Sequence, residues 1–406
     1  MKNKTFEQYK PLLIYTLVVL AVSLFLPLSW ADDAVFMQKT ANKTITEFLS
    51  GSARPFTDGL TYVFARNQWM WRILNPFVLL LCIISVDKTL PRKSTKGETV
   101  FLELAITFIM MAFVDAGFIA TTVNYLWPVA FGIFSLISVK ATFEEKNTSL
   151  LYKIVSIPLL VYSTNMQQMC AVLFAIFLSF NIYLAFKKRF RFFHFLQLLI
   201  AGGGMALSLY LNFTGDNSRI IRETKRYFPG FMELNIFQKA ELGFSSTFFC
   251  CIMEMWLPYF AFLGFTIFLA VKTFRRKSKL LPKIVSASIP AAATICGILS
   301  LFENRFYKFL AGQTSGTGQP KVAYSFNAIL FCIFAVVCLF LLYTIIQLPE
   351  NNKLKFFAFS AFILGLGARM IMGFSPTVWA SGYRTFSIML MSFVYIILIV
   401  NKSEKI

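Results

Sequence analysis

The chain has 406 residues, of which 57% are hydrophobic and 14% are charged, and its mean hydropathy is +0.66. This composition excludes a soluble globular protein, which could not bury so much apolar surface, and a closed β-barrel would need alternating segments that the sequence lacks. The net charge of +20 is typical of cytoplasmic loops that face anionic lipid, so we expect membrane lipid and no nucleic acid as a partner.

Long apolar runs predict an all-α, polytopic membrane protein with about twelve transmembrane helices, each needing about 20 residues to cross the hydrocarbon. We treat residues 1–406 as a single integral-membrane domain. The predicted cores are 12–28, 71–86, 100–119, 126–139, 154–162, 169–186, 195–211, 244–271, 284–302, 324–346, 356–372 and 386–400.

Lys and Arg in the short loops, such as Lys187 to Arg189, predict that both termini are cytoplasmic and that the protein lies in the cell membrane. The predicted outer loops are 32–70, 212–243, 303–323 and 373–385. The first two carry apolar residues at helical spacing, which predicts amphipathic helices on the outer leaflet. Gly and Ser between residues 315 and 318 predict a mobile third loop.

Asp32 and Asp33 open the first outer loop, directly after the first predicted span. Partial desolvation at a membrane surface raises the pKa of a carboxyl group and makes it a better general base. A neighbouring carboxylate adds repulsion unless a cation bridges the two, so a divalent cation is a candidate cofactor. The alternative is a pair of solvated surface carboxylates.

Arginines of the outer loops are candidates for binding phosphate, because the guanidinium group donates two parallel hydrogen bonds. The compact loop 375–383 contains a proline and a glycine and ends at Arg384. The alternative is anchoring to lipid headgroups. The candidate phosphate-binding residues are Arg66, Arg72, Arg219 and Arg384.

Charges within predicted spans are costly in hydrocarbon and usually face a cavity or a partner. They are Glu103, Asp115, Glu254 and Arg369. Asp115 comes shortly before a polar and aromatic segment, and a polar break follows the fifth span. The predicted site-lining residues are Asp115, Asn124, Tyr125, Trp127, Gln167, Gln168 and Tyr383.

Metal and nucleotide sites have little support in the sequence. The seven cysteines lie in apolar stretches without a CxxC pair, which predicts buried thiols. The single histidine, His194, is predicted to lie at the membrane interface, so a His-based zinc site is not expected. No GxxxxGK[ST] or HExxH motif is present.

The order of these features resembles the GT-C type of integral-membrane glycosyltransferase, and within it bacterial Gtr-type (serotype-converting) glucosyltransferases and related uncharacterised polytopic membrane proteins. The matching stretches are Asp32-Asp33 and the segments 124–127, 215–219 and 375–385. The resemblance implies that a hexose moves from a polyprenyl-phosphate donor to a cell-surface glycan acceptor, with Asp32 or Asp33 as the base. It also implies a Glu-Gln pair where this sequence reads Gln167-Gln168, so a carboxylate is missing there.

Two other functions share the size and topology. A polysaccharide (O-antigen or capsule) polymerase or ligase would act on diphosphate-linked glycans. A transporter or flippase for lipid-linked sugars predicts pseudo-symmetric halves and charges along a central pathway. Long outer loops and sparse charge at the predicted midplane favour the glycosyltransferase over transport.

Overall fold

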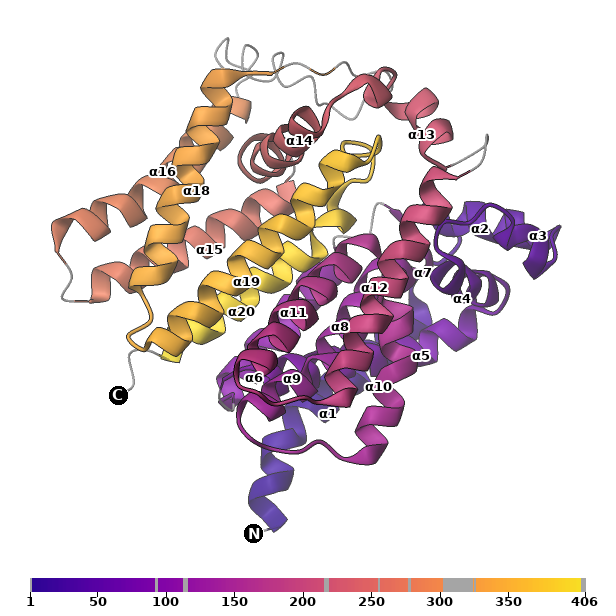
Figure 1. The fold of residues 1–406 in the computed structure, drawn as a ribbon, viewed down its shortest axis with the longest axis horizontal. Helices are drawn as coiled ribbons and strands as arrows, with labels where there is room; N and C mark the ends of the chain where they lie inside the picture. The colour runs from indigo at the N-terminus through magenta and orange to yellow at the C-terminus, as the bar shows by residue number, and fades with distance from the viewer. Residues whose placement is uncertain are drawn as a thin grey trace. The chain divides into compact units, whose positions relative to one another are not determined.

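A computed structural model describes residues 2–91, 94–111, 116–214, 219–254, 256–276, 279–301, 324 and 326–402. Every regular element in these ranges is helical (Figure 1). Among the described residues, nine helices are long and apolar enough to cross a membrane, which is consistent with a multi-pass membrane protein. They are Gln68–Thr89, Phe118–Phe143, Gln167–Phe186, Phe192–Asn212, Leu257–Arg275, Leu280–Leu299, Ala328–Gln347, Asn352–Phe374 and Tyr383–Asn401.

The first, third and fifth predicted spans are not among these nine. The apolar helices Lys10–Phe25 and Leu150–Ser163 correspond to the first and fifth predicted cores. The third corresponds to α6, Lys96–Met111, and its continuation through residues 112–115, including Asp115, lies outside the described residues. The number of about twelve spans therefore stays a prediction.

The segment 244–271 is not one continuous α-helix as predicted. Helix α14 (Ile236–Phe249) gives way to a π-helical turn at Cys250–Glu254, and α15 (Trp256–Arg275) follows. Helix α14 packs closely on another segment, since a Cβ on Gly243 would lie 2.1 Å from the carbonyl oxygen of Met370. Helix α14 begins at Ile236, which lies inside the predicted outer loop 212–243.

The chain forms two compact units, residues 1–219 and 220–406. In the first unit, α1, α5 and α6 contact one another, α8 packs on α5 and α10, and α11 packs on α12 (Figure 1). The helices not yet defined are α1 (Lys2–Phe25), α5 (Gln68–Thr89), α8 (Trp127–Ser135), α10 (Leu150–Ser163), α11 (Gln167–Phe186) and α12 (Phe192–Phe213).

The predicted loop 32–70 contains three short helices, α2 (Ala31–Ala41), α3 (Ile45–Leu49) and α4 (Pro55–Arg66). They gather beside α7 (Phe118–Thr121) in Figure 1, and α2 and α4 contact each other and α7. Helices in this loop were expected from the spacing of apolar residues, and the structure contains them. Their position on the outer leaflet stays a prediction.

The second unit packs its long helices as consecutive neighbours, α15 on α16, α16 on α18, α18 on α19, and α19 on α20. Their bounds are α16 (Leu280–Leu301), α18 (Ala328–Gln347), α19 (Asn352–Met370) and α20 (Ser387–Lys402). The predicted mobile loop 303–323 lies outside the described residues. A short helix, α13 (Arg219–Tyr227), begins in the predicted outer loop 212–243.

Candidate functional site

Asp33 fastens helix α2 to the start of helix α7. Its side chain is only 1% exposed, Oδ2 accepts a hydrogen bond from the N–H of Ile119 at 3.0 Å, and Oδ1 accepts one from the N–H of Ala120 at 2.8 Å. The first N–H groups of a helix have no partner within the helix, and an acidic side chain satisfies them favourably. Asp33 therefore acts as a cap supplied by a distant segment.

Gly117 makes room for this carboxyl group. Its φ of +88° lies in the left-handed region, and a Cβ at this position would be 2.8 Å from Cγ of Asp33. Both the backbone conformation and the space require glycine. The carboxyl group of Asp33 fills the volume that a side chain at position 117 would occupy.

The environment of Asp33 perturbs its titration. Burial raises the pKa of this carboxyl to about 6, while hydrogen bonds from the backbone of Ala120, Ile119 and Phe118 oppose the rise. The charge of Asp32 adds a smaller increase. Both oxygens of Asp33 already accept hydrogen bonds, which fits a positioning role better than contact with a substrate.

Asp32 is the more accessible member of the pair. It is half-buried in the first turn of α2, next to Ala31, whose φ of +49° is unusual for a residue with a side chain. Strained residues of this kind cluster at functional sites. The indole N–H of Trp30 is buried and has no acceptor among the described residues. The turn at Ala31 therefore carries the half-buried carboxylate of Asp32 and, in Trp30, a buried N–H donor without an acceptor among the described residues.

Two of the predicted phosphate-binding arginines bind carbonyl groups in the structure. Arg66 donates from Nε to the carbonyl oxygen of Thr40 at 3.0 Å, at the C-terminal end of α2. Arg72 donates to the carbonyl oxygens of Ser23 and, at 2.9 Å, Leu26, at the end of α1. The last carbonyls of a helix lack partners and carry partial negative charge, so both arginines stabilise helix ends.

The predicted segment 124–127 forms a break in a long helical segment. A π-helical turn, Thr122–Leu126, separates α7 from α8. Asn124 is buried and donates to the carbonyl oxygen of Ala120 and to Oγ1 of Thr61, and Trp127 donates to Oδ1 of Asn75 at 3.0 Å. These side chains hold the break within the protein interior.

A second polar group surrounds the start of α4, and the sequence interpretation missed most of it. The hydroxyl of Ser52 donates to Asp58, and the guanidinium of Arg54 lies 5.7 Å from the ring centre of the half-buried Tyr125. Oδ1 of Asn165 accepts from the N–H of Phe56 at 2.9 Å. Pro55 at the first helical position, with Asp58 in the first turn, was the available signal.

The predicted residues Gln167 and Gln168 open α11 shortly after Asn165. Gln167 is half-buried and Gln168 is buried. Asn165, two residues before Gln167, accepts a hydrogen bond at the start of α4. Gln167 and Gln168 therefore lie in the same part of the first unit as the polar group around the start of α4. The carboxyl group of Asp33 belongs to a different group of contacts, because it binds the backbone of Ile119 and Ala120.

Of the other predicted residues, Tyr383 and Arg384 lie in the second unit, and Arg219 is the last residue of the first. Arg384 is half-buried and donates from Nε to the carbonyl oxygen of Ser381 at 2.9 Å, and the neighbouring Tyr383 is also half-buried. Arg219 is half-buried at the start of α13. Gly382, with φ of +62°, shapes the turn before Tyr383. These positions are compatible with phosphate binding, which stays a prediction.

Arg369 is completely buried in the second unit. Its Nη2 donates to the carbonyl oxygen of Val378 at 3.3 Å, and the guanidinium lies 4.5 Å from the ring centre of Phe386. Nε and Nη1 have no hydrogen-bond partner among the described residues. Arg369 was predicted to face a cavity or a partner, and in the structure its partners are the carbonyl group of Val378 and the ring of Phe386.

Comparison with known proteins does not assign a family. No family model, no curated protein and no solved structure matches the chain. The resemblance to GT-C glycosyltransferases therefore rests on the sequence features alone.

The described residues contain no group of three His, Cys, Asp or Glu side chains that could hold a metal ion. His194 is buried, not interfacial as predicted, because its ring bonds Thr142 at 2.8 Å and Gln197 at 2.9 Å. The cysteines are free thiols, and Cys332 is exposed where a buried side chain was expected. The strongest candidate site in the first unit is the turn that carries Asp32.

Proposed function

We propose that the protein is a membrane glycosyltransferase that moves a hexose from a polyprenyl-phosphate donor to a cell-surface glycan acceptor. The observation that carries the proposal is the fixed position of Asp32, in the first turn of a helix that Asp33 fastens to α7. A general base must be held in place relative to its substrate. A tethered helix at the end of an apolar bundle provides such a position.

In the proposed reaction, Asp32 accepts the proton of an acceptor hydroxyl while the hydroxyl oxygen attacks the anomeric carbon of the hexose. The bond between that carbon and the phosphate oxygen breaks, and polyprenyl phosphate leaves with the electron pair. Asp33 positions α2 and does not touch the substrate. Binding of the donor phosphate by Arg219 or Arg384 remains a prediction, whereas Arg66 and Arg72 bind carbonyl groups.

Transfer by the reconstituted full-length protein tests the proposal. With a radiolabelled polyprenyl-phosphate hexose and a cell-surface glycan, we expect Asp32→Asn to lower kcat by at least about 100-fold, the usual minimum for a lost general base. Glu47→Gln is the matched control. Glu47 is exposed in the same segment and forms a capping box with Thr44, which glutamine preserves.

Transfer by Asp32→Asn at the wild-type rate would refute the assigned base. Transfer by neither wild type nor variant, together with uptake of the labelled lipid sugar into sealed vesicles, would favour a transporter. Asp33→Asn serves to separate positioning from catalysis. It is expected to lower thermal stability as well as activity, because asparagine offers one acceptor oxygen where both oxygens of Asp33 accept hydrogen bonds from the start of α7.

A further inference from the structure

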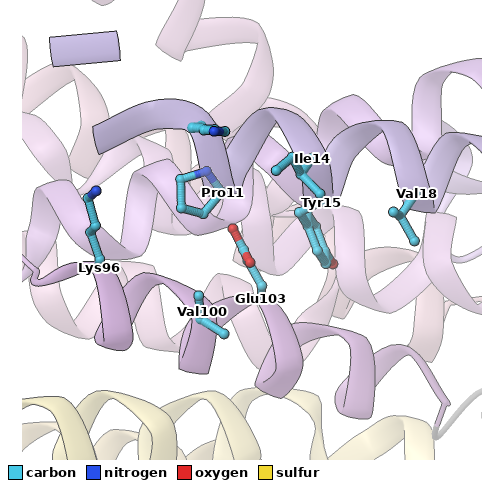
Figure 2. Close-up of a pocket in the computed structure, with 8 residues that line it drawn as sticks. Pro11, Ile14, Tyr15, Val18, Lys96, Val100 and Glu103 are labelled. Atoms are coloured by element: carbon cyan, nitrogen blue, oxygen red, sulfur yellow. The ribbon is translucent and has the colours of Figure 1, made fainter. Parts of the chain in front are cut away.

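A groove of about 400 Å³ runs between helices α1 and α6 of the first unit (Figure 2). Its lining residues on α1 are Lys10, Pro11, Ile14, Tyr15 and Val18, and those on α6 are Lys96, Val100 and Glu103. A hydrogen bond of 3.1 Å between the hydroxyls of Tyr15 and Thr107 joins the two helices beside it. The groove is distinct from the turn that carries Asp32.

Helical spacing explains why these residues share a groove. Positions 10, 14 and 18 lie four residues apart on α1, and positions 96, 100 and 103 lie four and three apart on α6, so each set forms one stripe along its helix. Ile14 and Val18 are more than half exposed, at 52% and 56%. The walls are therefore open and apolar, as a surface that contacts hydrocarbon should be.

Glu103 lies between the two helices with its carboxyl group directed toward α1 near Pro11 (Figure 2). The side chain is only 7% exposed, and Oε1 is buried without a hydrogen-bond partner among the described residues. A buried polar group in this state lacks an interaction that proteins nearly always supply. In its acid form, a carboxyl group at this position can donate a hydrogen bond.

Two lysines mark one end of the groove. Lys10 and Lys96 are exposed and come at the starts of the apolar parts of α1 and α6. Lys96 lies about two helical turns from Glu103 along α6, and Lys10 directly precedes Pro11 on α1. Exposed lysines at the ends of membrane helices attract anionic headgroups. The groove therefore combines two cations, a carboxyl group and apolar walls.

We propose that this groove binds one anionic glycerophospholipid. Lys10 and Lys96 contact its phosphate, the acid form of Glu103 donates to a carbonyl oxygen of its glycerol esters, and Ile14, Val18 and Val100 contact an acyl chain. The combination of charge, hydrogen bonding and apolar surface in one groove favours a lipid over another helix. The inference is independent of the proposed transfer reaction, because none of these residues belongs to the α2 turn.

Lipid retention by the full-length protein tests the proposal. The protein is reconstituted in nanodiscs of phosphatidylcholine with a minor fraction of phosphatidylglycerol, and native mass spectrometry counts the lipids that stay bound. We expect selective retention of one phosphatidylglycerol. The double variant Lys10→Gln/Lys96→Gln should lose about 25-fold in selectivity, roughly fivefold per lysine. The control Lys146→Gln/Lys187→Gln removes two exposed lysines elsewhere in the first unit and should retain it.

Variants of the carboxyl group and the wall test the remaining contacts. Glu103→Gln keeps a neutral donor and should bind within about twofold of wild type, whereas Glu103→Leu should lose about fivefold. Val100→Trp keeps every charge, fills the groove from an exposed wall position and should block binding, which guards against loss of fold as the explanation.

Three results would overturn the proposal. One is equal retention of the two lipids by the wild-type protein. Another is displacement of phosphatidylglycerol by millimolar inorganic phosphate, because the apolar walls would then contribute nothing. The third is efficient cross-linking between two copies through Val18→Cys, which would show that a second chain occupies the groove.

Discussion

At the scale of single residues, Asp33 connects a titratable group to the stability of the α2–α7 junction. Its two oxygens bind backbone N–H groups 86 and 87 positions away, so the contact joins segments that the sequence alone does not bring together. Burial raises the pKa of its carboxyl from 3.8 to about 6. The folded state therefore binds this proton more tightly than the unfolded state does.

The sign of the pH dependence follows from that raised pKa. The part of the stability that comes from protonation of Asp33 is fully present below pH 3.8 and is lost as pH rises to about 6, an effect of about 3 kcal/mol. We expect the difference in unfolding midpoint between wild type and Asp33→Asn to change over this window. As pH rises, the midpoint of wild type should fall relative to that of the variant. Thermal melts in detergent from pH 3.5 to 7 measure it, and a constant difference would contradict the assignment.

At the scale of elements, long apolar runs were sufficient to predict most of the membrane helices. Nine described helices of spanning length overlap predicted cores. The interruption at Cys250–Glu254 was missed because apolar residues continue through it, and only Glu254 and Pro258 hinted at a break. The contact between Gly243 of α14 and the backbone of Met370, far along the chain, is likewise not visible in the sequence.

The candidate site was predictable only in part. The position of Asp32 and Asp33 after the first apolar helix was visible in the sequence, but their division of roles depends on Gly117, Ile119 and Ala120. The roles of Arg66 and Arg72 also escaped prediction, because an arginine that caps a helix looks the same in sequence as one that binds phosphate.

Gly117 offers a test of the junction between α2 and α7. We expect Gly117→Ala to lower the free energy of unfolding by more than about 2 kcal/mol, since it combines a left-handed φ with a clash against Asp33. Gly59→Ala is the control, because a methyl group at this position within α4 would meet no atom within 4 Å, and it should stabilise by about 0.5–1 kcal/mol. Denaturant titration of both variants checks the prediction, and equal effects would refute it.

At the scale of the whole molecule, the distribution of lysine and arginine predicts which ends of the helices face the cytoplasm. Lys43 follows α2 and Lys146 follows the segment 137–143, and both side chains are exposed. In intact cells, we expect a membrane-impermeant maleimide to label Lys43→Cys but not Lys146→Cys, with unsubstituted protein as the background. The reverse labelling pattern would show the opposite topology, with Asp32 on the cytoplasmic face.

The enclosed guanidinium of Arg369 has a consequence for biosynthesis. Helix α19 is made before Val378 and Phe386, the residues that provide its carbonyl and its ring. Arg369 lies in the last turn of α19, where an unpartnered arginine still costs free energy during insertion, although less than the about 3 kcal/mol of one at the centre of a membrane helix. The segment from Asn352 to Lys402 should therefore leave the translocon as a hairpin, with α20 arriving before α19 is fully released into lipid.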